Sequence, residues 1–292
     1  MHDYPVWIDH FIARFASASL LQKTEILQSF TQLDQRLPVQ AQELVYQTAL
    51  HAKLDTSPDV TDHTNQELFS TAIIALSKAT DIRSQAIALL SDCLAHPLWF
   101  IRGNAALSLA MLGVSDEAII SRIADLLFDK AGNDWHVFES ALQALEILGG
   151  RAQGELPKVL RLVSFYLHDT DGGGWNDTGI YLADCLAAIG DNSSAVISML
   201  CQIIAKRRSS AYQACIALGM LGTTEEQATQ AIASYLCSDD MPADEARKAH
   251  ELIDTLISVA GEKHAIVGQC LTHLLQSPFP DVAHIARQRL SS

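Results

Sequence analysis

The sequence has few of the features that mark most binding and catalytic proteins. Aromatic residues make up 7% of its 292 residues, and positive charge is scarce: 20 Lys and Arg stand against 34 Asp and Glu, a formal net charge of −14. This balance argues against nucleic acid or an anionic membrane as partner, because both are held by basic side chains. No apolar stretch of about 18 residues occurs, so we expect no membrane-spanning segment.

Catalytic and cofactor motifs are missing as well. The sequence contains no G-x-S-x-G, H-E-x-x-H, phosphate-binding G-K-S/T or dinucleotide-binding G-x-G-x-x-G pattern. Its six cysteines lie in apolar contexts without a C-x-x-C pair, which favours reduced thiols buried as small hydrophobes. The first residues show no basic segment followed by an apolar one. We therefore expect a cytoplasmic protein that is not an enzyme and has no catalytic residues, cofactor or metal.

What the sequence does contain is an internal repeat. Five apolar segments end in glycine, at Gly113, Gly149, Gly190, Gly222 and Gly261, which are 36, 41, 32 and 39 residues apart. Leucine or isoleucine stands four residues before each glycine, and apolar residues stand one and eight before it. This spacing is one stripe of an α-helix. A glycine just after the stripe is typical of the left-handed residue that ends a helix.

A second amphipathic segment precedes each glycine-ended helix, so the repeating unit is helix, turn, helix, glycine. The first helices of these units are expected at 87–94, 119–128, 156–167, 196–205 and 228–236, and a further helix of this kind is expected at 265–275, after the last repeat glycine. A single helical hairpin cannot cover its own apolar face, so hairpins must stack. We predict an all-α fold, a right-handed α-α superhelical solenoid of about six to seven helical hairpins.

The segment 94–106, LAHPLWFIRGNAA, resembles the turn and second helix of a HEAT repeat of the HEAT-like, PBS-lyase type. The HEAT pattern has a proline, then Val-Arg, then paired alanines; here these are Pro97, Ile101-Arg102 and Ala105-Ala106. Pro278, Val282 and Ala286 repeat the spacing. The resemblance covers residues 83–292 and implies the solenoid fold, but it says little about function.

Residues 1–80 are less regular, with helices expected at 7–15, 20–33, 39–54 and 68–76. Terminal repeats are atypical because one of their faces meets water. We therefore interpret this segment as an irregular N-terminal cap with degenerate repeats, within a single solenoid domain of residues 1–292.

Tryptophans recur at one place in successive hairpins. Trp99 and Trp135 lie 14 residues before their closing glycines, Trp175 lies 15 before its own, and Arg208 takes the equivalent place in the next hairpin. Stacking would line these side chains along one edge, as in an interface hot spot. Alternatively, each indole fills the seam between neighbouring turns. The expected partner-binding residues are Trp99, Arg102, Asn104, Trp135, His136, Glu139, Trp175, Asn176, Asp177, Tyr181 and Arg208.

The second helices are expected to turn further polar side chains towards the groove. Ser108, Gln143, Glu146, Asp184 and Gln213 belong to this set. Together with the partner-binding residues they lean acidic, so a partner with a basic surface would be complementary. An ordinary solvated helix face is the alternative.

The loop 168–177, HDTDGGGWND, begins like a calcium site with Asp169-Thr170-Asp171. Gly173 and Ile180 stand where two of the ligands belong, so we expect no metal there. The glycines indicate either an insert that reshapes the groove or a tolerated loop extension.

These features favour a non-catalytic scaffold or adaptor that binds a protein with a basic surface and could inhibit it. Three alternatives stay open: a lyase subunit of the bilin-lyase type, an immunity protein against a toxin, and a structural subunit of an assembly. The first is suggested because residues 102–106 (RGNAA) resemble the repeats of bilin lyases. DNA glycosylases with HEAT-like repeats use a Trp and an Asp, similar to Trp175 and Asp177. Their groove must be basic, however, and this one is not.

Overall fold

A computed structural model describes residues 6–33, 36–55, 63–129, 135–168, 178–206, 209–238, 248–261 and 264–291. The chain divides into two compact units, residues 1–148 and 149–292, and each is described by itself. Within the described ranges every regular element is a helix and none is a strand. The predicted all-α class is confirmed, while a single domain over 1–292 with a cap at 1–80 stays a prediction. None of these helices is long and apolar enough to cross a bilayer.

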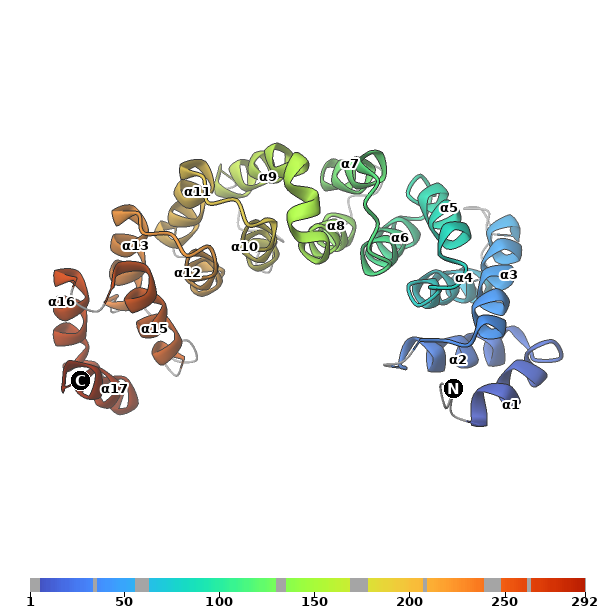
Figure 1. Cartoon of the computed structure of the whole chain (residues 1–292), viewed down its shortest axis with the longest axis horizontal. Coiled ribbons are helices and arrows are strands. Elements are labelled where there is room, and N and C mark those ends of the chain that lie inside the picture. The colour runs from blue at the N-terminus through green and yellow to red at the C-terminus, as the bar shows by residue number, and fades with distance from the viewer. Residues whose placement is uncertain are drawn as a thin grey trace. The chain divides into compact units, whose positions relative to one another are not determined.

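The first unit is built from two rows of helices (Figure 1). Its elements are α1 (Val6–Phe15), α2 (Leu20–Thr31), α3 (Val39–Asp55), α4 (His63–Leu76), α5 (Arg83–Cys93), α6 (Trp99–Met111), α7 (Glu117–Asp125), the 3-10 turn η1 (Leu126–Phe128) and α8 (Trp135–Leu148). Helices α4, α6 and α8 pack against one another in what we call the second-helix row, and α5 and α7 lie behind it. The hairpins α5–α6 and α7–α8 are those that the repeat predicted.

The second unit repeats the arrangement. Its elements are η2 (Gly149–Glu155), α9 (Leu156–His168), α10 (Thr178–Ile189), α11 (Ser194–Ala205), α12 (Ala211–Met220), α13 (Glu226–Leu236), α15 (Ala249–Ala260), α16 (Ala265–Leu274) and α17 (Pro280–Ser291). Helix α12 packs between α10 and α15, while α13 packs between α11 and α16 (Figure 1). Stacked hairpins of this kind are the solenoid architecture, here seen within each unit.

The five repeat glycines end their helices as predicted. All have positive φ, at 71°, 57°, 70°, 62° and 84° in chain order from Gly113 to Gly261. At Gly113 the backbone ends α6 with the two hydrogen bonds of a Schellman motif. The Gly113 N–H donates to the Ala110 carbonyl at 2.8 Å, and the Val114 N–H donates to the Leu109 carbonyl at 3.2 Å. Because this geometry needs a left-handed residue, a side chain at that position would be strained.

The core of each unit is the apolar stripe on its second helices. The leucines four residues before the first four repeat glycines (Leu109, Leu145, Leu186 and Leu218) are fully buried. Each such side chain contributes about 1.5–3 kcal/mol by leaving water. The stripe is weaker at its C-terminal end, where Leu221, Ile257 and Ala260 are only half-buried.

We predict that replacing a repeat glycine destabilises the chain through backbone conformation alone. Gly222 has φ of +62° and open space around an added Cβ, so Gly222→Ala should lower the free energy of unfolding by about 1–2 kcal/mol. Gly154 also has open space but no positive φ, and Gly154→Ala should change it by less than about 1 kcal/mol or raise it. Urea denaturation followed by circular dichroism measures both. Equal losses in the two variants would contradict this account of the repeat glycines.

Candidate functional site

The turn between α5 and α6 is held by Arg102, which lies on the first turn of α6. One Nη atom donates to the carbonyls of His96 and Pro97, at 2.7 and 2.9 Å. The Nε atom lies 2.6 Å from a carboxylate oxygen of Asp129, the residue that follows η1 in the next hairpin. The Arg102 side chain of this ion pair is 6% exposed and the Asp129 side chain is 15% exposed, so a mostly buried pair joins two successive turns.

His96 completes the interior of this turn. Its ring is buried and meets Phe69 of α4 edge-on, with the ring centroids 5.5 Å apart. The Nδ1 atom accepts a hydrogen bond from the Leu98 N–H, which requires an unprotonated Nδ1. Burial, and then the charges of Lys53 and Arg102, lower the pKa of His96 below its ordinary value. The imidazole is therefore a neutral structural group.

The N-terminal ends of α6 and α8 carry an aromatic edge made of Trp99, Phe100 and His136. The Trp99 and His136 rings stack, with centroids 5.4 Å apart and planes at 20°. Phe100 meets Trp99 edge-on at 5.5 Å. All three side chains keep part of their surface in solvent. Trp135 begins α8 as Trp99 begins α6, which is the predicted equivalence, but its side chain lies outside the described part of the chain.

A polar strip runs along the middle of the second-helix row. The Asn104 amide donates to the Ser70 hydroxyl of α4 at 2.7 Å, and the Ser108 hydroxyl donates to the Ile73 carbonyl at 3.0 Å. On the other side of α6, Gly103 lies so close to Ser140 of α8 that a Cβ atom would collide with the serine side chain. These contacts set α4, α6 and α8 parallel and in register.

Three exposed aliphatic side chains lie near the C-terminal ends of the same helices, and we call them the aliphatic edge. Ile74 is 39% exposed, Met111 55% and Ile147 46%. We did not expect this edge from the sequence, although the signal was present. Met111 and Ile147 both stand two residues before a repeat glycine, outside the buried stripe, and so does Met220, which is 66% exposed.

Several predicted binding residues lie outside the described residues. These are Trp175, Asn176, Asp177 and Arg208, and of the loop 168–177 only His168 is described. The aromatic ridge from Trp99 to Trp175 therefore stays a prediction. Tyr181 is half-buried on α10.

Other predicted groove residues pair with each other in the second unit. The Gln213 amide of α12 donates to the Asp184 carboxylate of α10. Burial raises the pKa of Asp184, although this hydrogen bond acts in the opposite direction. Two side chains that we expected to line an acidic groove thus bond to each other between neighbouring helices.

Three of the predicted surface residues are buried instead. Arg102, Ser108 and Glu139 are 5%, 2% and 8% exposed, so the expected surface position is wrong for each of them. Arg102 and Ser108 bond to backbone carbonyls between elements, and Glu139 lies 3.9 Å from the Nδ1 atom of His136. Their polar groups are directed into the packing between hairpins, where they hold the aromatic edge and the row in place.

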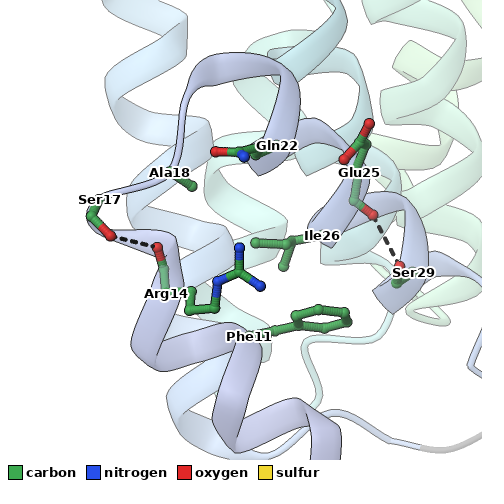
Figure 2. A pocket seen from close by; sticks show the side chains of 8 residues that line it. All are labelled: Phe11, Arg14, Ser17, Ala18, Gln22, Glu25, Ile26 and Ser29. Atoms are coloured by element: carbon green, nitrogen blue, oxygen red, sulfur yellow. Dashed lines mark hydrogen bonds between the residues drawn. The ribbon is translucent and has the colours of Figure 1, made fainter.

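A pocket of about 380 Å³ lies between α1 and α2, away from the second-helix row. Figure 2 shows the Arg14 side chain extending into it between Phe11 and Ile26. The serine hydroxyls at its rim are used locally, because Ser17 donates to the Arg14 carbonyl and Ser29 to the Glu25 carbonyl.

Metal binding finds no support in the described ranges. No group of three or more His, Cys, Asp or Glu side chains in them is close enough to hold an ion. The one loop with a partial calcium pattern, 169–177, lies outside those ranges.

No protein-family model matches the sequence, and no curated protein is significantly similar to it. Among solved structures, the chain is similar to the complex of CpcE and CpcF of phycocyanin lyase from Nostoc sp. PCC7120. That match has a TM-score of 0.47 and 18% identity and covers 100% of this chain and 96% of the other. A crystal structure of an engineered protein matches with a TM-score of 0.40 and 15% identity, covering 98% of this chain and 96% of the other.

The first of these comparisons corrects one expectation. The absence of catalytic motifs led us to expect a protein that is not an enzyme, whereas the similar structure is that of a lyase complex. The expectation of a non-enzyme is therefore wrong as stated, and we do not retain it. The motifs whose absence suggested it belong to other enzyme classes, so their absence could not exclude a lyase.

We predict that Arg102 stabilises the repeat junction far more than an exposed arginine does. Arg102→Ala should cost at least about 3 kcal/mol of unfolding free energy, because it removes a buried guanidinium from the carbonyls of His96 and Pro97 and from the Asp129 carboxylate. The matched control is Arg289→Ala, which removes an ion pair to Asp254 whose side chains are 45% and 51% exposed. It should cost at most about 1 kcal/mol. Equal losses in urea denaturation would show that the Arg102 junction has no special role.

Proposed function

We propose that this chain is a protein-binding subunit that holds its partner on the second-helix row of the first unit. The observation that carries this proposal is the pair of exposed edges on α4, α6 and α8. Along α6 the aromatic edge at Trp99 and the aliphatic edge at Met111 are about 18 Å apart, at 1.5 Å per residue. A surface of this length suits a protein partner better than a small molecule.

The aromatic edge supports an anchoring role. Stacking on His136 holds the Trp99 indole in one orientation, so little side-chain freedom would be lost on binding. Tryptophan is among the residues most enriched at binding hot spots. The half-exposed indole therefore offers a rigid apolar surface at the end of the row.

The aliphatic edge supports contact along the length of the row. Ile74, Met111 and Ile147 stay exposed although each lies on a helix whose neighbouring apolar residues are buried. Large exposed apolar side chains on three helices packed in one row are the kind of surface that interaction sites use. Met111 adds adaptability, because an unbranched thioether side chain fits varied surfaces.

The net charge bears on the kind of partner. At −14, the chain favours association with a protein that presents a basic surface. An inhibitor of such a protein and an immunity protein against a basic toxin are both variants of this proposal. We also propose a cytoplasmic location, which the six free cysteines support.

The proposal predicts that both edges of the row are needed to retain the partner. Partner proteins would be recovered on the tagged chain from its native cells, identified by mass spectrometry, and their affinity measured by calorimetry. Trp99→Ala and Met111→Glu should each weaken binding about 10-fold or more, as loss of a hot-spot contact does.

The matched control is Phe165→Ala, which removes a 52%-exposed aromatic side chain from α9 in the second unit. It should leave the affinity unchanged. Circular dichroism would confirm that all three variants fold. A partner that binds the Trp99 and Met111 variants as tightly as the parent chain would refute the proposed surface.

A second candidate function is a lyase subunit of the bilin-lyase type. It is supported by the segment Arg102-Gly103-Asn104-Ala105-Ala106, which resembles the repeats of those enzymes. In this candidate the partner held on the second-helix row would be the protein that receives the chromophore.

The second candidate predicts visible absorbance after expression in a host that makes a bilin. The purified chain, or a protein recovered with it, should carry the chromophore, and Trp99→Ala should reduce the amount. Absorption spectra and zinc-enhanced fluorescence on denaturing gels measure this. A colourless chain with colourless partners would exclude the candidate.

A further inference from the structure

Two cysteines from different hairpins meet in the second unit. Cys237 ends α13 and Cys270 lies within α16, 33 positions further along the chain. Their sulfur atoms are 2.8 Å apart, which places one thiol in direct hydrogen-bonding contact with the other. This pair belongs to neither edge of the first unit, and the proposed function does not use it.

The two thiols differ in access. Cys270 is 3% exposed, whereas Cys237 is half-buried. Cys237 also lines a pocket of about 290 Å³ whose walls include Leu274, Phe279 and Val282, with His273 and Ser238 as polar neighbours. A small molecule in this pocket would therefore reach the Cys237 sulfur before that of Cys270.

The two thiols also differ in acidity. The hydrogen bond from Cys270 lowers the pKa of Cys237, although burial opposes the effect. The same bond, together with burial and the negative charge on Cys237, raises the pKa of Cys270. Two other cysteines give a comparison: burial raises the pKa of Cys93 and of Cys201 to about 11 each. The thiolate, which is the nucleophilic form of cysteine, is thus favoured at Cys237.

We propose that Cys237 and Cys270 form a dithiol–disulfide site that takes low-molecular-weight organic disulfides. The Cys237 thiolate attacks one sulfur of the incoming disulfide, forms a mixed disulfide and releases one small thiolate. The Cys270 thiol then loses its proton and attacks the Cys237 sulfur, which releases the second small thiol and leaves an internal disulfide. The two cysteines lose two electrons and two protons in total, and the incoming disulfide is reduced to two thiols.

The attack of Cys270 on the Cys237 sulfur requires only a small movement. A disulfide bond is about 2.05 Å long, so the two sulfurs need to approach by about 0.8 Å. The bond would join α13 to α16 and close a loop that contains α15. Because α15 packs against both helices, the oxidised form would hold this end of the second unit in one arrangement.

The test uses the reduced full-length chain, oxidised glutathione as the probe, and intact mass measurement with peptide mapping. The parent chain should form the Cys237–Cys270 disulfide, with the loss of two hydrogens. Cys270→Ser should accumulate one glutathione on Cys237, because the resolving thiol is gone. Cys237→Ser should leave Cys270 unmodified. Cys201→Ser is the matched control in the same unit and should behave like the parent chain.

Cys270→Ala provides a second variant in case the serine hydroxyl disturbs the packing of α16. As a measurement that needs no variant, iodoacetamide should alkylate Cys237 about 10-fold faster than Cys201 or more. The proposal is overturned if the parent chain forms no Cys237–Cys270 disulfide, or if glutathione on the Cys270 variants is spread evenly over the remaining cysteines. Neither result bears on the second-helix row of the first unit, so the two proposals fail independently.

Discussion

The structure depends on how the apolar stripe of each second helix is kept from water. A hairpin has too little surface to bury Leu109 or Leu145 by itself, so each stripe is covered by its own first helix and by the helices of neighbouring hairpins. This requirement makes the hairpins stack, sets the helices of each row in parallel register, and demands a sharp chain reversal after every second helix. The left-handed glycines from Gly113 to Gly261 supply that reversal.

Stacking also decides which polar groups are available for function. Arg102 is drawn into the junction because its stem can cross from one turn to the next and its guanidinium finds two carbonyls and the Asp129 carboxylate there. Asn104 and Ser108 are held in the same way by α4. Among the described residues of the row, Trp99 and His136 near the helix starts and Met111 and Ile147 near the helix ends keep part of their surface in solvent. The candidate surface is therefore made of side chains near the ends of α4, α6 and α8 that the packing between these helices leaves partly exposed.

The proposed dithiol site in the second unit arises from the same stacking of hairpins. Neither Cys237 nor Cys270 stands out locally, since each follows the apolar pattern of its own helix. The contact between α13 and α16 brings their sulfurs together, and the hydrogen bond between the two thiols lowers the pKa of Cys237 and raises that of Cys270. A repeat protein can thus carry chemistry in one unit and a binding face in another, because each hairpin contacts only its neighbours.

The sequence by itself determined the helix pairs, the glycine ends and most of the buried stripe, because these follow from local periodicity and backbone sterics. It also placed Trp99 and Trp135 at the starts of equivalent helices. Only the tertiary structure decided which way long polar side chains turn and which distant residues touch. Periodicity could not show that Arg102 and Glu139 are buried, that Met111 and Ile147 remain exposed, or that Cys237 meets Cys270. Those outcomes depend on contacts between hairpins, whose spacing and register are set by the whole stack and not by any one segment.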